Sequence, residues 1–155
     1  MRGLRARRQG YLGNVWVHWM VDSELKIVIP LEKSKVFTLR QTLRSLLCRH
    51  NIPGDVADDI VLSTQEACNN AIIHSHAPEG VVEITAYLDD GRVSIEVRDR
   101  GCGFDASAIC VDDQPDIRRT SGRGLFLIYH LMDDVEVCSS ATGTVVRMSK
   151  FTAAY

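Results

Sequence analysis

The stretch Glu66-Ala-Cys-Asn-Asn70-Ala-Ile-Ile-His74 is the second half of a predicted helix, and it decides how the rest of the chain is interpreted. Its apolar residues continue a helical stripe that begins at Val56, Ile60 and Leu62, which predicts one buried face. Glu66 and Asn70 lie four residues apart, about one helical turn, and therefore project from the same face. A carboxylate and a carboxamide in this arrangement can serve a proton and a divalent cation together. A solvated polar pair is the alternative, and other parts of the sequence decide between the two.

The composition is that of an ordinary globular domain, with 45% hydrophobic and 25% charged residues in 155. A chain of this length buries roughly 70% of its extended surface on folding, which is enough for one core. The formal charge of −2 gives no basis for a general nucleic-acid or membrane role. The five cysteines form no Cys-x-x-Cys and no metal-like pairing with histidine, which favours reduced thiols in a cytoplasm over disulfides or a structural zinc.

Residues 1–22 do not share the regular pattern that follows them. Four arginines precede Tyr11–Met20, an apolar run that polar residues interrupt and that is shorter than the roughly 20 residues needed to span a bilayer. We expect an unstructured extension over 1–22, although a basic segment with two tryptophans would also suit contact with a membrane surface or a partner. A domain over 23–152 follows, and a biological start at Met20 is a further hypothesis.

The remaining chain predicts five strands and three helices in an order that does not alternate. Strands are expected at Leu25–Ile29, Val81–Leu88, Arg92–Arg98, Val135–Cys138 and Thr144–Met148. Helices are expected from an N-cap at Ser34 to Arg49, from a cap at Asp55 to about His74, and over Gly124–Met132. This order disfavours a doubly wound sheet and predicts an α+β, two-layer sandwich whose mainly antiparallel sheet is covered on one face by about three helices. The long loop over 99–121 is expected to be functional.

The stretch Asp99-Arg-Gly101-Cys-Gly103-Phe104 follows one of the predicted buried strands. Glycines at such a place allow positive φ and a close approach of the backbone to a ligand. Asp99, at the strand end, can accept a hydrogen bond from the exocyclic amine of a purine. A tight turn capped by an Asx interaction would account for the same residues.

The stretch Ser121-Gly122-Arg-Gly124-Leu125 opens the last predicted helix. The free N–H groups and positive dipole of a helix N-terminus form a natural phosphate site. Two glycines that merely flank a loop are the alternative. The stretch lacks the Gly-x-x-x-x-Gly-Lys-Ser/Thr pattern, which excludes a P-loop.

Taken in chain order, these three stretches resemble the nucleotide site of the ATPases shared by gyrase, the heat-shock chaperones, histidine kinases and mismatch-repair proteins. Within this superfamily, Ser63–His74, Asp99–Asp105 and Gly122–Ile128 look like the corresponding motifs of the bacterial anti-sigma-factor serine/threonine kinases. Phe104-Asp105 and Leu131-Met-Asp-Asp-Val135 favour that branch. The resemblance runs from about Leu25 to Phe151 and implies a Bergerat-type ATP-binding fold.

The resemblance also implies roles for individual residues. Asn70 would ligate Mg²⁺, which bridges the phosphates, and Glu66 would be the general base for an attacking hydroxyl. Asp99 would bind the adenine amine, while Gly101 and Gly103 would let the backbone approach the base.

On the phosphate side, the resemblance implies that Gly122, Arg123 and Gly124 form the hinge of a lid over about 105–121. Thr144 matches a family position beside the adenine. Three arginines, Arg118, Arg119 and Arg123, could reach the γ-phosphate, but none of them is assigned a catalytic role. His74 and His76 are expected to be structural rather than phosphorylated, because no dimerisation hairpin precedes the domain.

The resemblance therefore implies a cytoplasmic kinase that uses ATP and Mg²⁺ to phosphorylate a serine or threonine of an anti-sigma-factor antagonist. Such a kinase also sequesters a sigma factor, usually as a homodimer, and no nucleic acid or membrane partner is expected. Two alternatives stay open: a regulator that binds nucleotide and sequesters a partner without transfer, and a switch kinase of a stress-signalling complex.

Overall fold

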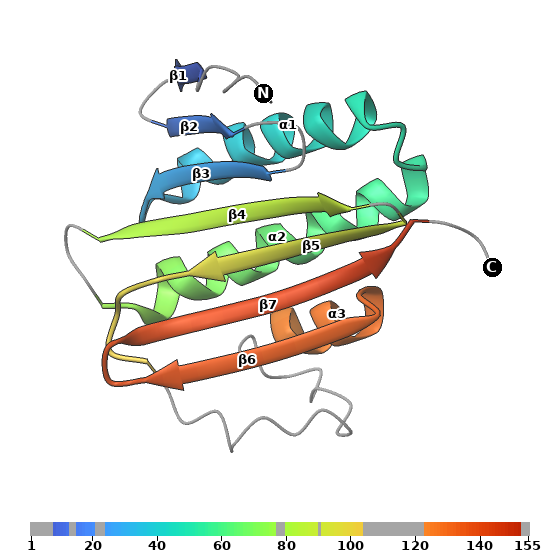
Figure 1. Cartoon of the computed structure of the whole chain (residues 1–155). Coiled ribbons are helices and arrows are strands. Elements are labelled where there is room, and N and C mark those ends of the chain that lie inside the picture. Colours follow the sequence, from blue (N-terminus) through green and yellow to red (C-terminus); the bar gives the residue numbers. More distant parts are fainter. Residues whose placement is uncertain are drawn as a thin grey trace, which may run out of the picture.

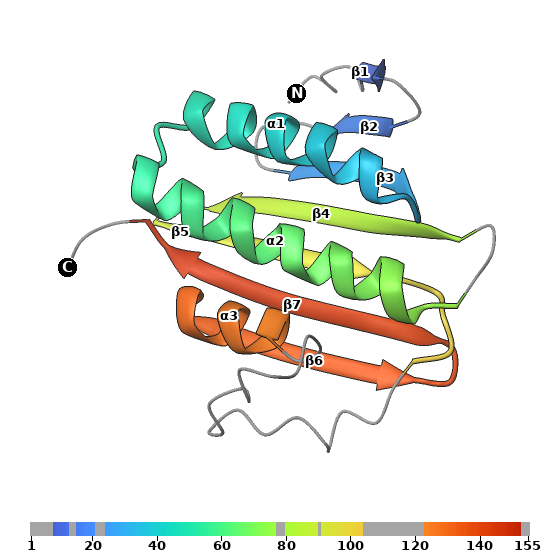
Figure 2. The same cartoon turned by 180° about the vertical axis from the view of Figure 1, so that it is seen from behind.

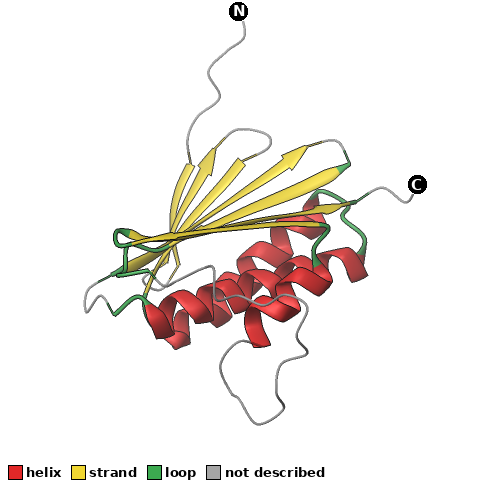
Figure 3. Cartoon of the chain, turned by 90° about the horizontal axis from the view of Figure 1, so that it is seen from below, coloured by secondary structure: helices red, strands yellow, loops and turns green. Residues whose placement is uncertain are grey.

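The computed structural model describes residues 8–12, 15–20, 24–76, 80–89, 91–103 and 123–152. Their strands form one antiparallel sheet in the order β1-β2-β3-β4-β5-β7-β6, and their three helices lie on one of its faces (Figures 1 and 3). The elements are β1 (Arg8–Leu12), β2 (Val15–Met20), β3 (Glu24–Pro30), α1 (Lys33–Arg49), α2 (Gly54–His74), β4 (Val81–Asp89), β5 (Arg92–Arg98), α3 (Arg123–Leu131), β6 (Asp134–Ser140) and β7 (Gly143–Phe151). The predicted α+β two-layer class is confirmed.

The core lies between the sheet and the helices because each strand alternates buried and open residues. On β5, for example, Val93, Ile95 and Val97 are buried, as the period of two predicts. The helices close the layer with apolar stripes, which on α1 comprise Val36, Leu39, Leu43, Leu46 and Leu47. None of the described helices is long and apolar enough to cross a membrane.

The expected unstructured extension over 1–22 is wrong for residues 8–12 and 15–20. These residues form β1 and β2, and β2 pairs antiparallel with β3, so that Val17 lies opposite Ile27. Val15-Trp-Val-His-Trp19 is rich in β-branched and aromatic residues, which favour strands, and β3 offers an edge whose backbone groups would otherwise lack a strand partner. The start at Met20 and the domain bounds 23–152 stay predictions.

The predicted caps of the first two helices are wrong by two residues, because Glu32 and Pro53 occupy the N-cap positions. α1 begins at Lys33, and Ser34 caps nothing but donates its hydroxyl to Glu32 at 3.4 Å. α2 begins at Gly54, which places Asp55 in the first turn, where its charge suits the helix dipole. Leu62 is 37% exposed, because it follows the fully buried Ile60 by only two positions, more than half a helical turn.

The last helix is held by a lysine from the final strand. Lys150 of β7 donates to the carbonyl of Leu131 at the end of α3 and pairs with Asp59 of α2, Nζ to Oδ2, at 2.9 Å. One side chain therefore joins both helices to the sheet. Figure 2, viewed from the helical side, shows α2 and α3 lying side by side across the sheet.

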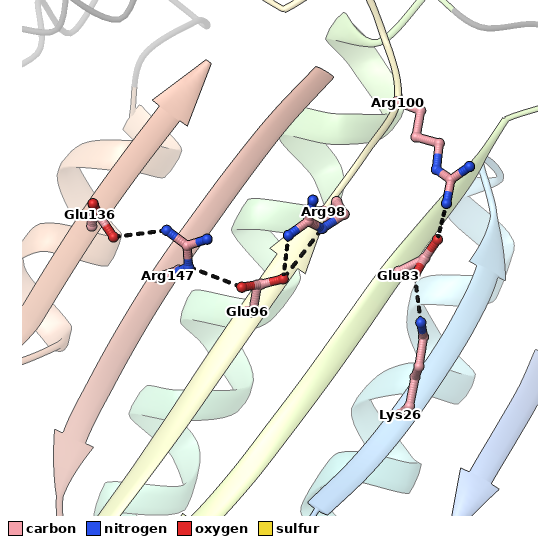
Figure 4. A network of polar contacts seen from close by, with 7 residues as sticks. All are labelled: Lys26, Glu83, Glu96, Arg98, Arg100, Glu136 and Arg147. Carbon is pink, nitrogen blue, oxygen red and sulfur yellow. Dashed lines mark hydrogen bonds and ion pairs between the residues drawn. The ribbon is translucent and has the colours of Figure 1, made fainter. Parts of the chain in front are cut away.

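The opposite face of the sheet carries ion pairs in place of a second helical layer (Figure 4). Glu96 accepts from Arg98 at 3.0 Å and from Arg147 at 2.9 Å. Glu83 lies between Lys26 at 2.6 Å and Arg100 at 3.2 Å. The hydrogen bond from Lys26 lowers the pKa of Glu83, against the opposing effect of partial burial.

Candidate active site

A cavity of about 230 Å³ lies between α2, α3 and the ends of β5 and β7. Residues that are far apart in the chain meet in it. Its lining comprises Ala67, Asn70, Ala71, His74, Ser75, Val97, Asp99, Gly103, Leu125, Thr144 and Val146. Four predicted site residues therefore line one cavity: Asn70, Asp99, Gly103 and Thr144.

Glu66 and Asn70 lie next to the first turn of α3. α2 is continuous from Gly54 to His74, so the two side chains share the face that the spacing predicts. A Cβ placed on Gly124 would lie 3.2 Å from Glu66 Oε2 and equally far from both polar atoms of the Asn70 carboxamide. The absence of a side chain at Gly124 therefore leaves these polar groups open beside the N-terminus of α3.

The Glu66 carboxylate has one oxygen occupied by a neighbouring side chain. Gln65 donates from Nε2 to Glu66 Oε1 at 3.4 Å, and Oε2 is the oxygen that lies beside Gly124. Glu66 is half-buried, so its carboxylate stays partly hydrated. This geometry suits a group that accepts a proton from a hydroxyl brought to the start of α3.

Asp99 is 8% exposed and is held by main-chain contacts at the end of β5. Its N–H donates to the carbonyl of Thr144 at 3.0 Å, and its Oδ1 accepts from the N–H of Gly101 at 2.8 Å. The Asx-type turn and a carboxylate at the cavity are therefore two aspects of one arrangement. The turn uses Oδ1, and none of the described residues donates a hydrogen bond to Oδ2.

Glycines let three backbone segments meet around Asp99. A Cβ on Gly101 would lie 2.6 Å from Ser75 Cβ, and a Cβ on Gly143 would lie 2.9 Å from Arg100 Cα. Gly103 has φ of +66°, and a Cβ there would lie 2.9 Å from Ser139 Oγ. The end of α2 and the turn between β6 and β7 therefore pack directly against the loop that carries Asp99.

Thr144 is buried, and its hydroxyl lies 3.0 Å from that of Ser139. Arg123 is the exposed first residue of α3, one position earlier than the predicted helix start. Gly122, Arg118, Arg119 and the proposed lid lie outside the described residues.

Sequence reasoning missed several lining residues. Ala67 and His74 follow from helical spacing, because they lie three and four residues from Asn70, and Ala71 lies four residues after Ala67. Ser75 and the positioning residue Gly143 gave no comparable signal. Their place depends on how the chain returns to Asp99 from distant segments.

The side chains at the cavity suit a magnesium ion better than a metal that is coordinated entirely by protein ligands. No group of three or more His, Cys, Asp or Glu side chains that could hold a metal occurs among the described residues. Mg²⁺ typically takes one or two protein oxygens and completes its shell with phosphates and water. The carboxamide oxygen of Asn70, half-buried at the cavity, is a suitable single ligand of this kind.

These features define a class of protein: a domain in which an antiparallel sheet and a helical layer enclose a cavity that Asn70, Asp99 and Thr144 line. The model of the histidine kinase-like ATPase domain family matches residues 29–150. The chain therefore belongs to the histidine kinase-like ATPase domain family.

Curated relatives define the branch within this family. The chain is 31% identical to a serine-protein kinase RsbW of Halalkalibacterium halodurans over 134 residues, which cover 82% of each protein. It is 29% identical to an anti-sigma F factor of Clostridium acetobutylicum over 137 residues, covering 84% of this chain and 95% of the relative. The predicted class, an anti-sigma-factor kinase of the histidine kinase-like ATPases, is confirmed by these relatives. Nucleotide binding follows from the ATPase family.

Solved structures show the same fold. The crystal structure of the RsbU and RsbW domains of a Mycobacterium tuberculosis protein matches with a TM-score of 0.68 and 22% identity. The match covers 89% of this chain and 35% of that one. The histidine kinase domain of a blue-light activated kinase from Erythrobacter litoralis matches with a TM-score of 0.54 and 20% identity, covering 80% of this chain and 62% of that one.

Proposed function

We propose that this chain transfers the γ-phosphoryl group of Mg·ATP to a serine or threonine hydroxyl of an anti-sigma-factor antagonist. The observation that carries the proposal is the meeting of Glu66, Asn70 and Gly124 beside a cavity that contains Asp99. A pure nucleotide binder needs an acceptor for the base, but it does not need a carboxylate at the phosphate end. The relatives named serine-protein kinase support transfer over binding alone.

The cavity orients the nucleotide from its base. Asp99 accepts from the adenine amine through Oδ2, because Oδ1 is engaged by Gly101. The apolar side chains of Ala67, Val97 and Leu125 line the cavity and offer the ring an apolar surface. This orientation directs the phosphates toward the start of α3, whose N–H groups and dipole favour anions.

Glu66 acts as the general base in this transfer. As the substrate hydroxyl attacks the γ-phosphorus, Glu66 Oε2 accepts its proton, the new O–P bond forms and the bond to the β-phosphate oxygen breaks. Asn70 would hold Mg²⁺ through its carboxamide oxygen, and the ion would supply charge neutralisation of the phosphates. Positioning and electrostatics thus supply most of the rate enhancement, as is usual for phosphoryl transfer.

The partners follow from the relatives. Proteins named anti-sigma F factor support a sigma factor as the second partner, with phosphorylation of the antagonist deciding which protein is held. A homodimer and a cytoplasmic location belong to the same proposal. A switch kinase of a stress-signalling complex would use the same site on a different substrate.

Glu66→Gln tests the transfer step, because the amide keeps the shape of the side chain but accepts no proton. Phosphorylation of the antagonist should fall by about 10²- to 10⁴-fold while ATP affinity is kept. Glu136→Gln is the matched control, since this exposed carboxylate pairs with Arg147 on the opposite face of the sheet.

The substrate is obtained by pull-down with and without ATP, followed by mapping of phosphorylated residues. Transfer is then measured with labelled ATP and the purified antagonist. Full transfer by Glu66→Gln would refute the role of the base. The absence of phosphoprotein with any captured partner would favour the binding-only regulator.

A further inference from the structure

The side-chain hydroxyl of Ser75 makes no hydrogen bond with the described residues. The residue follows the last turn of α2, is 5% exposed and lines the cavity. Its N–H donates to the carbonyl of Ala71 at 3.0 Å, and its carbonyl accepts from the N–H of Cys102 at 3.2 Å. Its Oγ is covered and has no hydrogen-bond partner among the described residues. Such orphaned buried groups are rare and call for a physical explanation.

The surroundings of Ser75 point to the nucleotide base. Its Cβ would lie 2.6 Å from a Cβ on Gly101, the residue whose N–H orients the Asp99 carboxylate. Ser75 therefore lies beside the acceptor for the purine amine. Thr144, the other hydroxyl-bearing residue in the described lining, shares a hydrogen bond with Ser139 at 3.0 Å. Ser75 is thus the hydroxyl in this lining that has no partner among the described residues.

An adenine ring presents two adjacent groups of opposite polarity on one edge. The exocyclic amine donates, and the neighbouring ring nitrogen N1 accepts. A carboxylate acceptor beside a hydroxyl donor matches this pair. Guanine presents the reverse polarity, with a carbonyl oxygen beside an N1–H, and therefore does not match the acceptor Asp99.

We propose that Ser75 is an adenine-contacting residue, whose hydroxyl donates to N1 of the base while Asp99 accepts from the amine. The assignment rests on the proposed nucleotide-dependent function. Because Oγ is covered in this structure, the contact requires a rotation about Cα–Cβ between staggered positions, which a serine makes readily. Ser75 then contributes to affinity and to base selectivity.

The test compares ATP with 1-deaza-ATP, in which a C–H group replaces N1. A neutral hydrogen bond of this kind corresponds to about 3- to 10-fold in affinity, so the wild-type protein should prefer ATP by that factor. Ser75→Ala should lose this factor for ATP and bind 1-deaza-ATP as the wild type does, so the preference disappears. Both dissociation constants are measured by calorimetry.

Ser63→Ala is the matched control. Ser63 lies on α2, is fully buried and also has an orphaned hydroxyl, but it is not among the described residues that line the cavity. It should keep the wild-type preference. If Ser75→Ala lowered the affinity for ATP and for 1-deaza-ATP by the same factor, Ser75 would have a packing role and the inference would be overturned.

Two results obtained with the wild-type protein separate this inference from the function it rests on. Equal affinity of the unmodified chain for ATP and 1-deaza-ATP overturns the role of Ser75 and leaves the proposed kinase intact. A failure of the unmodified chain to bind ATP overturns both. Neither measurement depends on the folding of a variant.

Discussion

Replacing Asp99 with asparagine should reverse the base preference of the cavity. The side chain keeps its shape, and its carbonyl oxygen still accepts from the N–H of Gly101. The other position changes from an acceptor oxygen to an NH₂ donor. That donor faces the adenine amine, which is itself a donor.

The magnitude follows from the bond that is lost. Hydrogen bonds to charged groups contribute about 1.5–3 kcal/mol, which corresponds to roughly a 10- to 150-fold loss of ATP affinity. Because Asp99 is only 8% exposed, water compensates little of this loss. Inosine triphosphate carries a carbonyl oxygen in place of the amine, so Asp99→Asn should bind it better than ATP.

Calorimetric titration of wild type and Asp99→Asn with both nucleotides measures the reversal. Asp89→Asn is a suitable control, because Asp89 is exposed at the β4–β5 turn, outside the described cavity lining. An Asp99→Asn protein that is folded and still prefers ATP over inosine triphosphate would refute the assignment of Asp99 to the base amine.

Three further outcomes are expected. Gly124→Ala places a methyl group 3.2 Å from Glu66 Oε2 and the Asn70 carboxamide, so phosphoryl transfer should fall at least tenfold while the melting temperature is kept. Transfer rates and thermal melts of the variant measure both quantities, and unchanged transfer would contradict the geometry. Lys26 lowers the pKa of Glu83, so their pair stabilises the fold above the ordinary carboxyl pKa and this stability is lost as pH falls. In urea titrations, wild type and Lys26→Met should therefore differ at about pH 7, and the difference should shrink as pH falls below the ordinary carboxyl pKa; a constant difference would refute this. Cys102, exposed beside the cavity, should react with a maleimide, and ATP should protect it. Burial raises the pKa of the Cys68 thiol, which should therefore stay unreactive in mass spectra of the labelled native protein. Labelling of Cys102 at the same rate with and without ATP would contradict the site.

Local spacing was sufficient to predict the parts of the site that depend on one element. Glu66 and Asn70 share a face because a helix fixes the direction of residues four apart, and Asp99 lies at a strand end because β5 alternates up to Val97. The order of these elements was in turn sufficient to predict the sandwich class, because each element is recognised from its own residues. These features need no knowledge of distant contacts.

The features that sequence reasoning missed depend on pairing partners or on return contacts. β2 forms because β3 offers an edge, and that edge cannot be seen in residues 15–20 alone. Ser75 lies at the cavity only because the loop of Asp99 folds back over the end of α2. The start of α1 was also missed, because its N-cap residue is Glu32, which makes no side-chain cap, and not Ser34.

The turn between β6 and β7 has a consequence for how the site can change. Ala141 and Thr142 are the whole connection, and Gly143 directly after them packs against the main chain of Asp99 and Arg100. An inserted residue in this turn would push on the carboxylate through the backbone, without altering any side chain that touches the ligand. Given the proposed role of Asp99, the length of this two-residue connection would help to set base selectivity, and comparison of side chains alone would overlook it.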